Sequence, residues 1–141
     1  MDWKGIGKEY LIRLYPGEEL VSSLNHWVQM VGLLGGTVEG LGGIRDVELA
    51  YFDLDKKSYH QWSNPGNWEL VHLWGNLTHR DGEPFWHIHA VIADRDGTCK
   101  AGHLISAAIS ITAELIIRPW SESVQRAPDE LTGLSLWHLE E

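Results

Sequence analysis

The amino-acid sequence predicts an α+β fold, mainly an antiparallel β-sheet packed by one or two helices. Three features support this fold class: an amphipathic helical stripe early in the chain, short strands joined by sequential turns, and one long alternating segment near residue 110. A chain of 141 residues buries about two-thirds of its unfolded surface but has no room for a second core. The sequence therefore predicts a single domain spanning residues 1–141.

The predicted helix lies in the segment GEELVSSLNHWVQMVGLL, which follows Pro16. Its apolar residues recur at helical spacing, as in a helix with one buried face. They are Leu20, Leu24, Trp27, Val28 and Val31. Glu18 and Glu19 are expected in the first turn, where the helix dipole favours negative charge, and Gly35-Gly36 is expected to end the helix.

The rest of the chain is predicted to form strands and turns. The expected strands are residues 47–54, 57–62, 68–75, 84–94 and 106–118. Turn signals separate the first four, at Asp55-Lys56, at the break Asn64-Pro65-Gly66 and at Asp81-Gly82. In the last strand, apolar residues at odd positions from 109 to 117 alternate with mostly polar residues, which predicts one buried face.

Cysteine content and hydropathy limit the class of protein. The single cysteine, Cys99, excludes an internal disulfide, and no apolar run like that of a signal peptide follows Met1. Nowhere does the sequence hold about 20 uninterrupted apolar residues, the length that a membrane-spanning helix needs. We therefore expect a soluble, cytoplasmic protein that makes no contact with a membrane.

The charge of the chain bears on nucleic-acid binding. Eleven Lys and Arg against twenty Asp and Glu give a net charge of −9, and Lys56-Lys57 is the only adjacent pair of basic residues. Sequence-independent affinity for nucleic acid comes from clustered cations that neutralise several phosphates. Direct binding of nucleic acid is therefore not expected from this composition.

Tryptophan is unusually frequent, with eight residues spread along the whole chain. Large aromatic side chains are enriched in cores and in the centres of subunit contacts. The excess favours an oligomer over a monomer.

Three of the eight histidines lie close together in the stretch FWHIHAVIADRDGTCKAGHL, residues 85–104. On a strand, His87 and His89 share one face. If Arg95-Asp96-Gly97 forms a three-residue turn with Gly97 in the left-handed conformation, His89 faces His103 on the neighbouring strand. A two-residue Asp96-Gly97 turn would instead place His103 opposite Ala90, on the wrong face.

Three neutral imidazoles on one face suit Zn²⁺, with a fourth position left for water or a carboxylate. Other borderline metals would bind the same ligands, and the competing interpretation is a set of hydrogen-bonded strand histidines, because the HxH spacing alone is weak evidence. Cys99 would lie too far along its strand to be the fourth ligand. The remaining histidines have no comparable partners and are interpreted as surface or core residues: His26, His60, His72, His79 and His138.

Two acidic residues stand alone within apolar strand segments. They are Glu69 and Glu114. A carboxylate in such a position is costly unless it has a partner, so each is a candidate for an acid-base group or a support for a metal ligand. The alternative for both is an exposed or partnered strand residue.

The order of several segments resembles the plants-and-prokaryotes conserved (PPC) domain in its stand-alone prokaryotic form, from about Tyr10 to Leu136. These segments are YLIRLYPGEELVSSL, GLGGIRDVELAYFD, WELVHLWGNL, DGEPFWHIHAVIADRDG, GHL, AEL and RAPDELTGLSL. The resemblance implies a PPC-domain fold, similar to that of acetolactate decarboxylase, and a homotrimer. It also implies a zinc site, found in some prokaryotic members, at the positions of His87, His89 and His103.

The resemblance leaves two classes of function. Plant members carry an Arg-Gly-Arg-Pro element that enters the DNA minor groove, and prokaryotic members share the DNA-binding label, but this chain has no such element. We therefore expect a trimeric zinc-binding PPC module with a regulatory or assembly role, acting through a protein partner. The alternative is a zinc-dependent lyase or hydrolase resembling acetolactate decarboxylase, in which Glu114 or Glu69 would supply the acid-base group.

Overall fold

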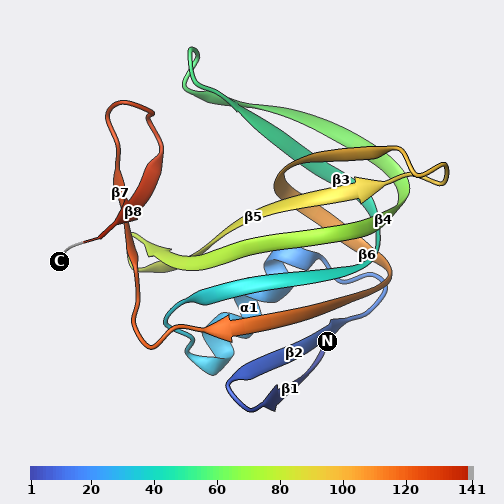
Figure 1. Ribbon diagram of the computed structural model, residues 1–141, viewed down its shortest axis with the longest axis horizontal. Helices are drawn as coiled ribbons and strands as arrows, with labels where there is room; N and C mark the ends of the chain where they lie inside the picture. The colour runs from blue at the N-terminus through green and yellow to red at the C-terminus, as the bar shows by residue number, and fades with distance from the viewer. Residues whose placement is uncertain (140–141) are drawn as a thin grey trace.

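The computed structural model describes residues 1–139, which form eight strands and one helix (Figure 1). In chain order these are β1 (Asp2–Ile6), β2 (Glu9–Leu14), α1 (Leu20–Val31), β3 (Gly36–Asp53), β4 (Ser58–Arg80), β5 (Glu83–Ala93), β6 (Cys99–Pro119), β7 (Gln125–Pro128) and β8 (Ser135–His138). The predicted α+β class is confirmed. At 12 residues, α1 is too short to span a membrane, and the described part of the chain holds no longer helix.

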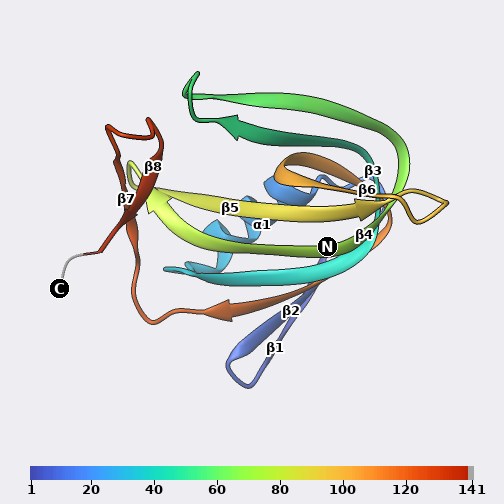
Figure 2. The same ribbon diagram turned by 45° about the horizontal axis from the view of Figure 1, so that its top comes forward.

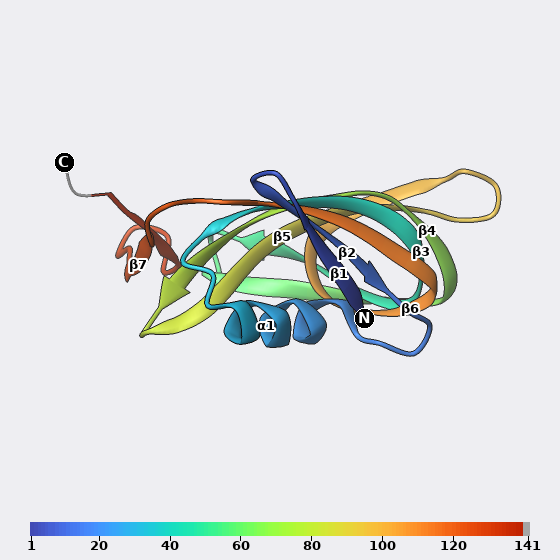
Figure 3. The same ribbon diagram turned by 90° about the horizontal axis from the view of Figure 1, so that it is seen from below.

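Strands β3, β4, β5 and β6 form a closed circuit of antiparallel pairs. The circuit closes because β6 is long: its first residues pair with β5 and its last residues pair with β2. The β1–β2 hairpin extends the sheet beyond β6, and β7 joins β4 through a single parallel pair, His79 with Gln125. In the side view α1 lies against one face of this arrangement (Figure 3). The core fills the space between the helix and the strands.

The helical stripe is confirmed, but the predicted end of the helix is wrong. Leu20, Leu24, Trp27 and Val28 are buried, and Val31 packs at the margin of the core. The helix ends at Gly32, which has a left-handed φ of 69° and donates its N–H to the carbonyl of Val28 at 2.9 Å. Gly36, which was expected to end the helix, begins β3 instead.

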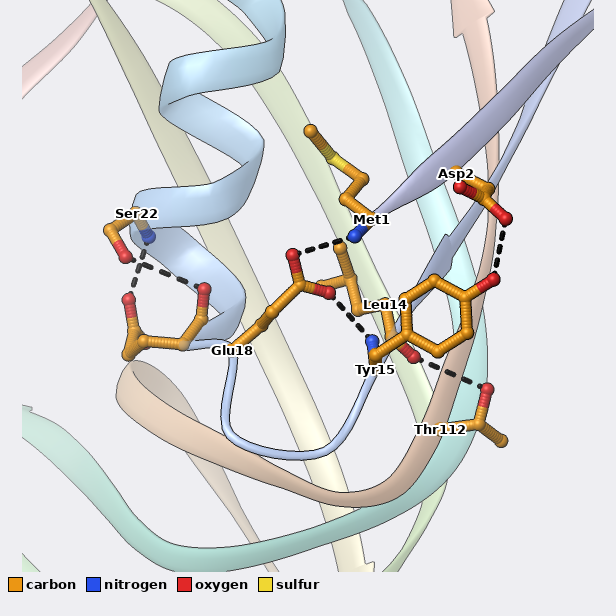
Figure 4. A network of polar contacts seen from close by, with 8 residues as sticks. Met1, Asp2, Leu14, Tyr15, Glu18, Ser22 and Thr112 are labelled. Atoms are coloured by element: carbon orange, nitrogen blue, oxygen red, sulfur yellow. Dashed lines mark hydrogen bonds and ion pairs between the residues drawn. The ribbon is translucent and has the colours of Figure 1, made fainter.

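The two glutamates stand before the first turn of the helix rather than within it. Glu19 is the N-cap, and its carboxylate accepts hydrogen bonds from the backbone N–H groups of Val21 (3.1 Å) and Ser22 (2.7 Å). Glu18 turns away from the helix and accepts from the backbone nitrogens of Tyr15 (2.6 Å) and Met1 (2.8 Å) (Figure 4). The pair therefore fixes the entry to the helix and ties it to the loop after β2.

The break expected at Asn64-Pro65-Gly66 does not interrupt β4. A bulge absorbs it: Asp46 on β3 and Gly66 on β4 both have positive φ, 51° and 78°, and the Gly66 N–H donates to the Asp46 carboxylate at 2.9 Å. The Asn64 side chain is buried and donates to the carbonyl of Val47 at 3.1 Å. The predicted strands 57–62 and 68–75 are thus parts of one strand.

Several strand segments were not predicted, and one predicted buried residue is exposed. The missed segments are β1, β2, the first eleven residues of β3, β7 and β8. The start of β3 is rich in glycine, which weakens a strand signal. Ile111 was expected in the buried face of residues 106–118, but the pairing of β6 with β3 skips two residues there and leaves this side chain 64% exposed.

Close contact between β3 and β6 accounts for one of these glycines. A Cβ on Gly42 would lie 2.1 Å from the carbonyl oxygen of Thr112, so no larger residue fits without moving a strand. We expect Gly42→Ala to lower the free energy of unfolding by about 1 to 3 kcal/mol in urea denaturation. Gly5→Ala is the matched control, because its Cβ would meet only the Tyr10 ring at 3.7 Å. Equal stability of the two variants would refute this close approach.

Candidate metal centre

The turn between β5 and β6 sets the positions of the histidines. Residues Arg95 to Gly97 form a three-residue loop, with Gly97 at a φ of 81°. The backbone N–H of Asp94 donates to the carbonyl of Thr98 (3.1 Å), and the Asp94 carboxylate accepts from the N–H groups of Asp96 and Thr98 (both 2.9 Å). Ala93 then pairs with Cys99, and His89 pairs with His103. The predicted three-residue register is confirmed, and the two-residue alternative is wrong.

With this register, His87, His89 and His103 meet on one face. Each offers one ring nitrogen, and the three nitrogens lie within 4.8 Å of one another. The Nε2 atoms of His87 and His89 are 3.2 Å apart. Two tetrahedral ligands with Zn–N bonds of about 2.0 to 2.1 Å stand about 3.3 Å apart, so this separation matches that of ligands to a common ion. Ile88, between the two, points into the core and is 1% exposed.

The surroundings of His87 and His103 favour the neutral form of imidazole that a metal needs. Burial, followed by the charges of His89, His103 and Arg126, lowers the pKa of His87 to about 4. Burial is also the main cause that lowers the pKa of His103. In addition, Nδ1 of His103 is buried and has no hydrogen-bond partner among residues 1–139. The Nε2 atoms of His87 and His89 share a hydrogen bond that a bound cation would replace, so the three residues fit a metal ion.

Three further residues surround the histidines, and the sequence analysis missed them. The Tyr59 ring stacks on His103, with centroids 5.0 Å apart and planes at 29°. Asn76 on β4 stands directly opposite His87 on β5. Nη2 of Arg126 donates to Oδ1 of Asn76 at 3.1 Å. No local pattern marks these residues, because Tyr59 and Arg126 arrive from segments distant in sequence.

Two parts of the fold deliver those residues. The end of the β3–β4 hairpin, which carries Tyr59, lies beside the β7–β8 segment in both views (Figures 1 and 2). A hydrogen bond of 2.9 Å from Nζ of Lys57 to the carbonyl of Glu130 links them. The Trp137 indole N–H also donates to Oδ1 of Asn76, at 3.2 Å. The histidine face is therefore bordered from two sides.

The candidate acids do not join the histidines. Glu69 and Glu114 are both exposed, on β4 and β6, and Glu114 stands opposite Arg13 and Leu41. Neither belongs to the group of converging metal-ligating atoms. Cys99 is also outside it and is exposed, with its Sγ 3.6 Å from the carbonyl of Gly97. Within residues 1–139, none of the other five histidines joins a second group of this kind.

The lowered pKa of His87 makes the stability of the metal-free protein depend on pH. Between about pH 6.5 and 4, an unfolded chain binds a proton at this histidine that the folded protein does not bind. The free energy of unfolding should therefore fall as the pH falls through this window, by at most about 1.4 kcal/mol per pH unit for this group. Urea denaturation in the presence of a chelator measures the slope. His87→Gln should show a shallower slope, and identical slopes would contradict the assignment.

Comparisons with known proteins agree with this geometry. Residues 1–121 match the model of the Plants and Prokaryotes Conserved (PCC) domain. A metal-containing protein from Archaeoglobus fulgidus is 31% identical, with a TM-score of 0.87 over 99% of both chains. A plant- and prokaryote-conserved protein from Pyrococcus horikoshii is 28% identical, with a TM-score of 0.87 over 99% of this chain and 96% of that one.

Two further relatives differ in length and in description. A proposed DNA-binding protein from Bacteroides thetaiotaomicron is 27% identical, with a TM-score of 0.93 over 97% of this chain and 96% of that one. The bifunctional protein GlmU of a Synechococcus strain is 31% identical over 136 residues, 94% of this chain, which spans only 20% of that relative's length. Given the family model that covers most of the chain, this protein belongs to the Plants and Prokaryotes Conserved family, abbreviated PCC or PPC.

Proposed function

We propose that this protein is a zinc-binding PPC module in which His87, His89 and His103 hold one Zn²⁺. The observation that carries the proposal is the convergence of three imidazole nitrogens within 4.8 Å on one face of a rigid hairpin. The metal-containing relative from Archaeoglobus fulgidus supports it. Bound zinc would supply a Lewis acid with one position open to a ligand. His89 is the exposed member of the three.

We further propose that three chains assemble through the outer face of the sheet. An outer patch, defined as Leu11, Leu41, Val71 and Trp74, exposes between 39% and 54% of each side chain. Three of them, Leu11, Leu41 and Val71, line a groove of about 700 Å³ formed by β1, β2, β3, β4 and β6. Contiguous apolar surface of this kind on a small protein usually serves association. Trp74 stands directly opposite His89, so the patch reaches the metal centre.

A regulatory or assembly role fits this chain better than direct DNA binding. One relative is a proposed DNA-binding protein, but this chain carries a net charge of −9, and a trimer would carry three times that, −27. Such a charge repels the phosphate backbone over roughly 8 Å at physiological salt. Any effect on transcription would then pass through a protein partner. The match to one fifth of GlmU supports a module that works joined to other proteins.

The alternative is a zinc-dependent lyase or hydrolase acting on a small molecule. Its supporting observation is the set of polar residues beside the histidines, Tyr59, Asn76 and Arg126. Such chemistry also needs a group that moves a proton at the reacting atom. The two acids considered for that role, Glu69 and Glu114, are exposed and lie outside the histidine group. We therefore rank the module ahead of the enzyme.

Zinc content tests the centre directly. We expect about one Zn²⁺ per chain by elemental analysis of the purified protein. His103→Ala removes a ligand and should weaken zinc binding by more than about a hundredfold, since losing even a group that supports a ligand costs 10- to 100-fold. His60→Ala is the control, because His60 is exposed and stacks on Trp62. Unchanged stoichiometry in His103→Ala would remove this residue from the site.

Light scattering tests the assembly. The wild-type protein should have about three times the chain mass of 16.0 kDa. Val71→Asp places a charge in the outer patch and should give a monomer that remains folded, because Val71 is 51% exposed in the single chain. Met30→Asp, on α1 at the opposite side of the molecule, is the control and should leave the mass unchanged. A wild-type monomer at micromolar concentration would refute the trimer.

A further inference from the structure

Arg126 sits in an unusual position for a surface arginine. It comes from β7, beyond the segment that the family model matches, and it is half-buried against β4. Its Nε donates to Oγ1 of Thr78 at 2.7 Å, Nη1 to the carbonyl of Ser135 at 2.9 Å, and Nη2 to Oδ1 of Asn76 at 3.1 Å. A guanidinium has five N–H donors. One donor on Nη1 and one on Nη2 therefore remain unused within residues 1–139.

No carboxylate balances the charge of Arg126. All three of its hydrogen-bond acceptors are neutral oxygens, and none of the ion pairs formed within residues 1–139 includes it. A second cation, Arg80, lies near it. Arg80 and Arg126 both lie over the Phe85 ring, at 4.4 and 4.8 Å from its centroid. A partly desolvated cation beside a second cation is stabilised by an anion.

The Arg126 side chain lies close to the histidines through Asn76. Asn76, which Arg126 holds, is the direct cross-strand neighbour of His87, and such neighbours stand roughly 5 Å apart at Cβ. Arg126 and the three histidines are therefore within the span of one small molecule.

We propose that Arg126 forms an oxyanion subsite beside the three histidines, and that the site binds a small molecule carrying a carboxylate or phosphate group. The anion accepts hydrogen bonds from Nη1 and Nη2, the two-point geometry that arginine offers to planar and tetrahedral oxyanions. The metal that His87, His89 and His103 would hold would supply a Lewis acid for a second oxygen of the same molecule. The metal half of this inference rests on the proposed function, whereas the anion half rests on Arg126.

The surroundings favour a small ligand over a nucleic-acid strand. Tyr59 and Trp137 stand beside the histidines and Asn76, and the Lys57 to Glu130 hydrogen bond joins the two segments that carry them. The net charge of −9 repels a polyanion, whereas a single oxyanion requires only the local potential of two arginines. For a regulatory module such a ligand would be an effector.

Calorimetric titration of the zinc-loaded full chain tests the subsite. The probes are glycolate, which pairs a carboxylate with a hydroxyl, and inorganic phosphate; glycolamide is the uncharged match of glycolate. We expect at least one of the two anions to bind and glycolamide not to bind. Arg126→Gln should weaken anion binding at least about tenfold, the usual loss for hydrogen bonds to a charged group. Arg118→Gln is the control, because Arg118 is already paired with Glu9 and Glu39.

The outcomes separate the ligand classes and the two proposals. Preference for glycolate or for phosphate assigns the class, and either supports the subsite. Binding that is unchanged in Arg126→Gln, equal for glycolamide, or seen only with a duplex oligonucleotide overturns it. If Arg126→Gln does not fold, Arg126→Lys replaces it as the test variant. Lysine keeps the positive charge but lacks the paired N–H donors of the guanidinium, so this variant should bind the anion several-fold more weakly than the wild-type protein. If the protein binds no zinc but the chelator-treated protein binds an anion, the anion subsite stands and the zinc proposal is wrong. If the protein binds zinc but no anion, the metal centre stands and the anion subsite is wrong.

Discussion

The hydrogen bonds of the turn from Asp94 to Thr98 decide what the rest of the site is. The Asp94 carboxylate holds two backbone N–H groups, and Gly97 takes the left-handed conformation that closes a three-residue loop. Side chains alternate between faces along a strand, so one residue more or less in this loop would turn His103 toward the core. The three imidazoles share a face because the loop between β5 and β6 has three residues. Everything proposed for the metal centre depends on that register.

The second constraint is the path of the chain around the outer face of β4 and β5. This face would be open to solvent in a simple sheet, but Asn76 and Thr78 on it are nearly fully buried. Arg126 covers them and donates two hydrogen bonds to β4 and one to β8. The same covering segment thus brings a cation without a carboxylate partner next to the three histidines. Stability of the C-terminal segment and ligand recognition would share one side chain.

The outer patch and the three histidines share a surface. One row of paired residues joins the outer patch to the histidines. It runs across the sheet from Ile116 on β6 to Glu39 on β3, then to Trp74 on β4 and His89 on β5. A subunit packed against the patch would lie at the margin of the histidines and change their exposure. If the proposed ligand and the proposed contact between chains both form, the ligand would influence that contact, since both would compete for the same strip of surface.

The sequence by itself determined what depends on near neighbours. The stripe from Leu20 to Val28 predicted the helix, and the Arg95-Asp96-Gly97 turn predicted the pairing of His89 with His103, because both rest on spacing within a few residues. Tertiary structure decided what depends on distant contacts. Tyr59 and Arg126 join the histidines only through the β3–β4 hairpin and the single pair of β7 with β4, which no local pattern encodes. Glu69 and Glu114 lie outside the histidine group for the same reason, because the face and the position of a residue along a long, bulged strand follow from pairings that the sequence does not display.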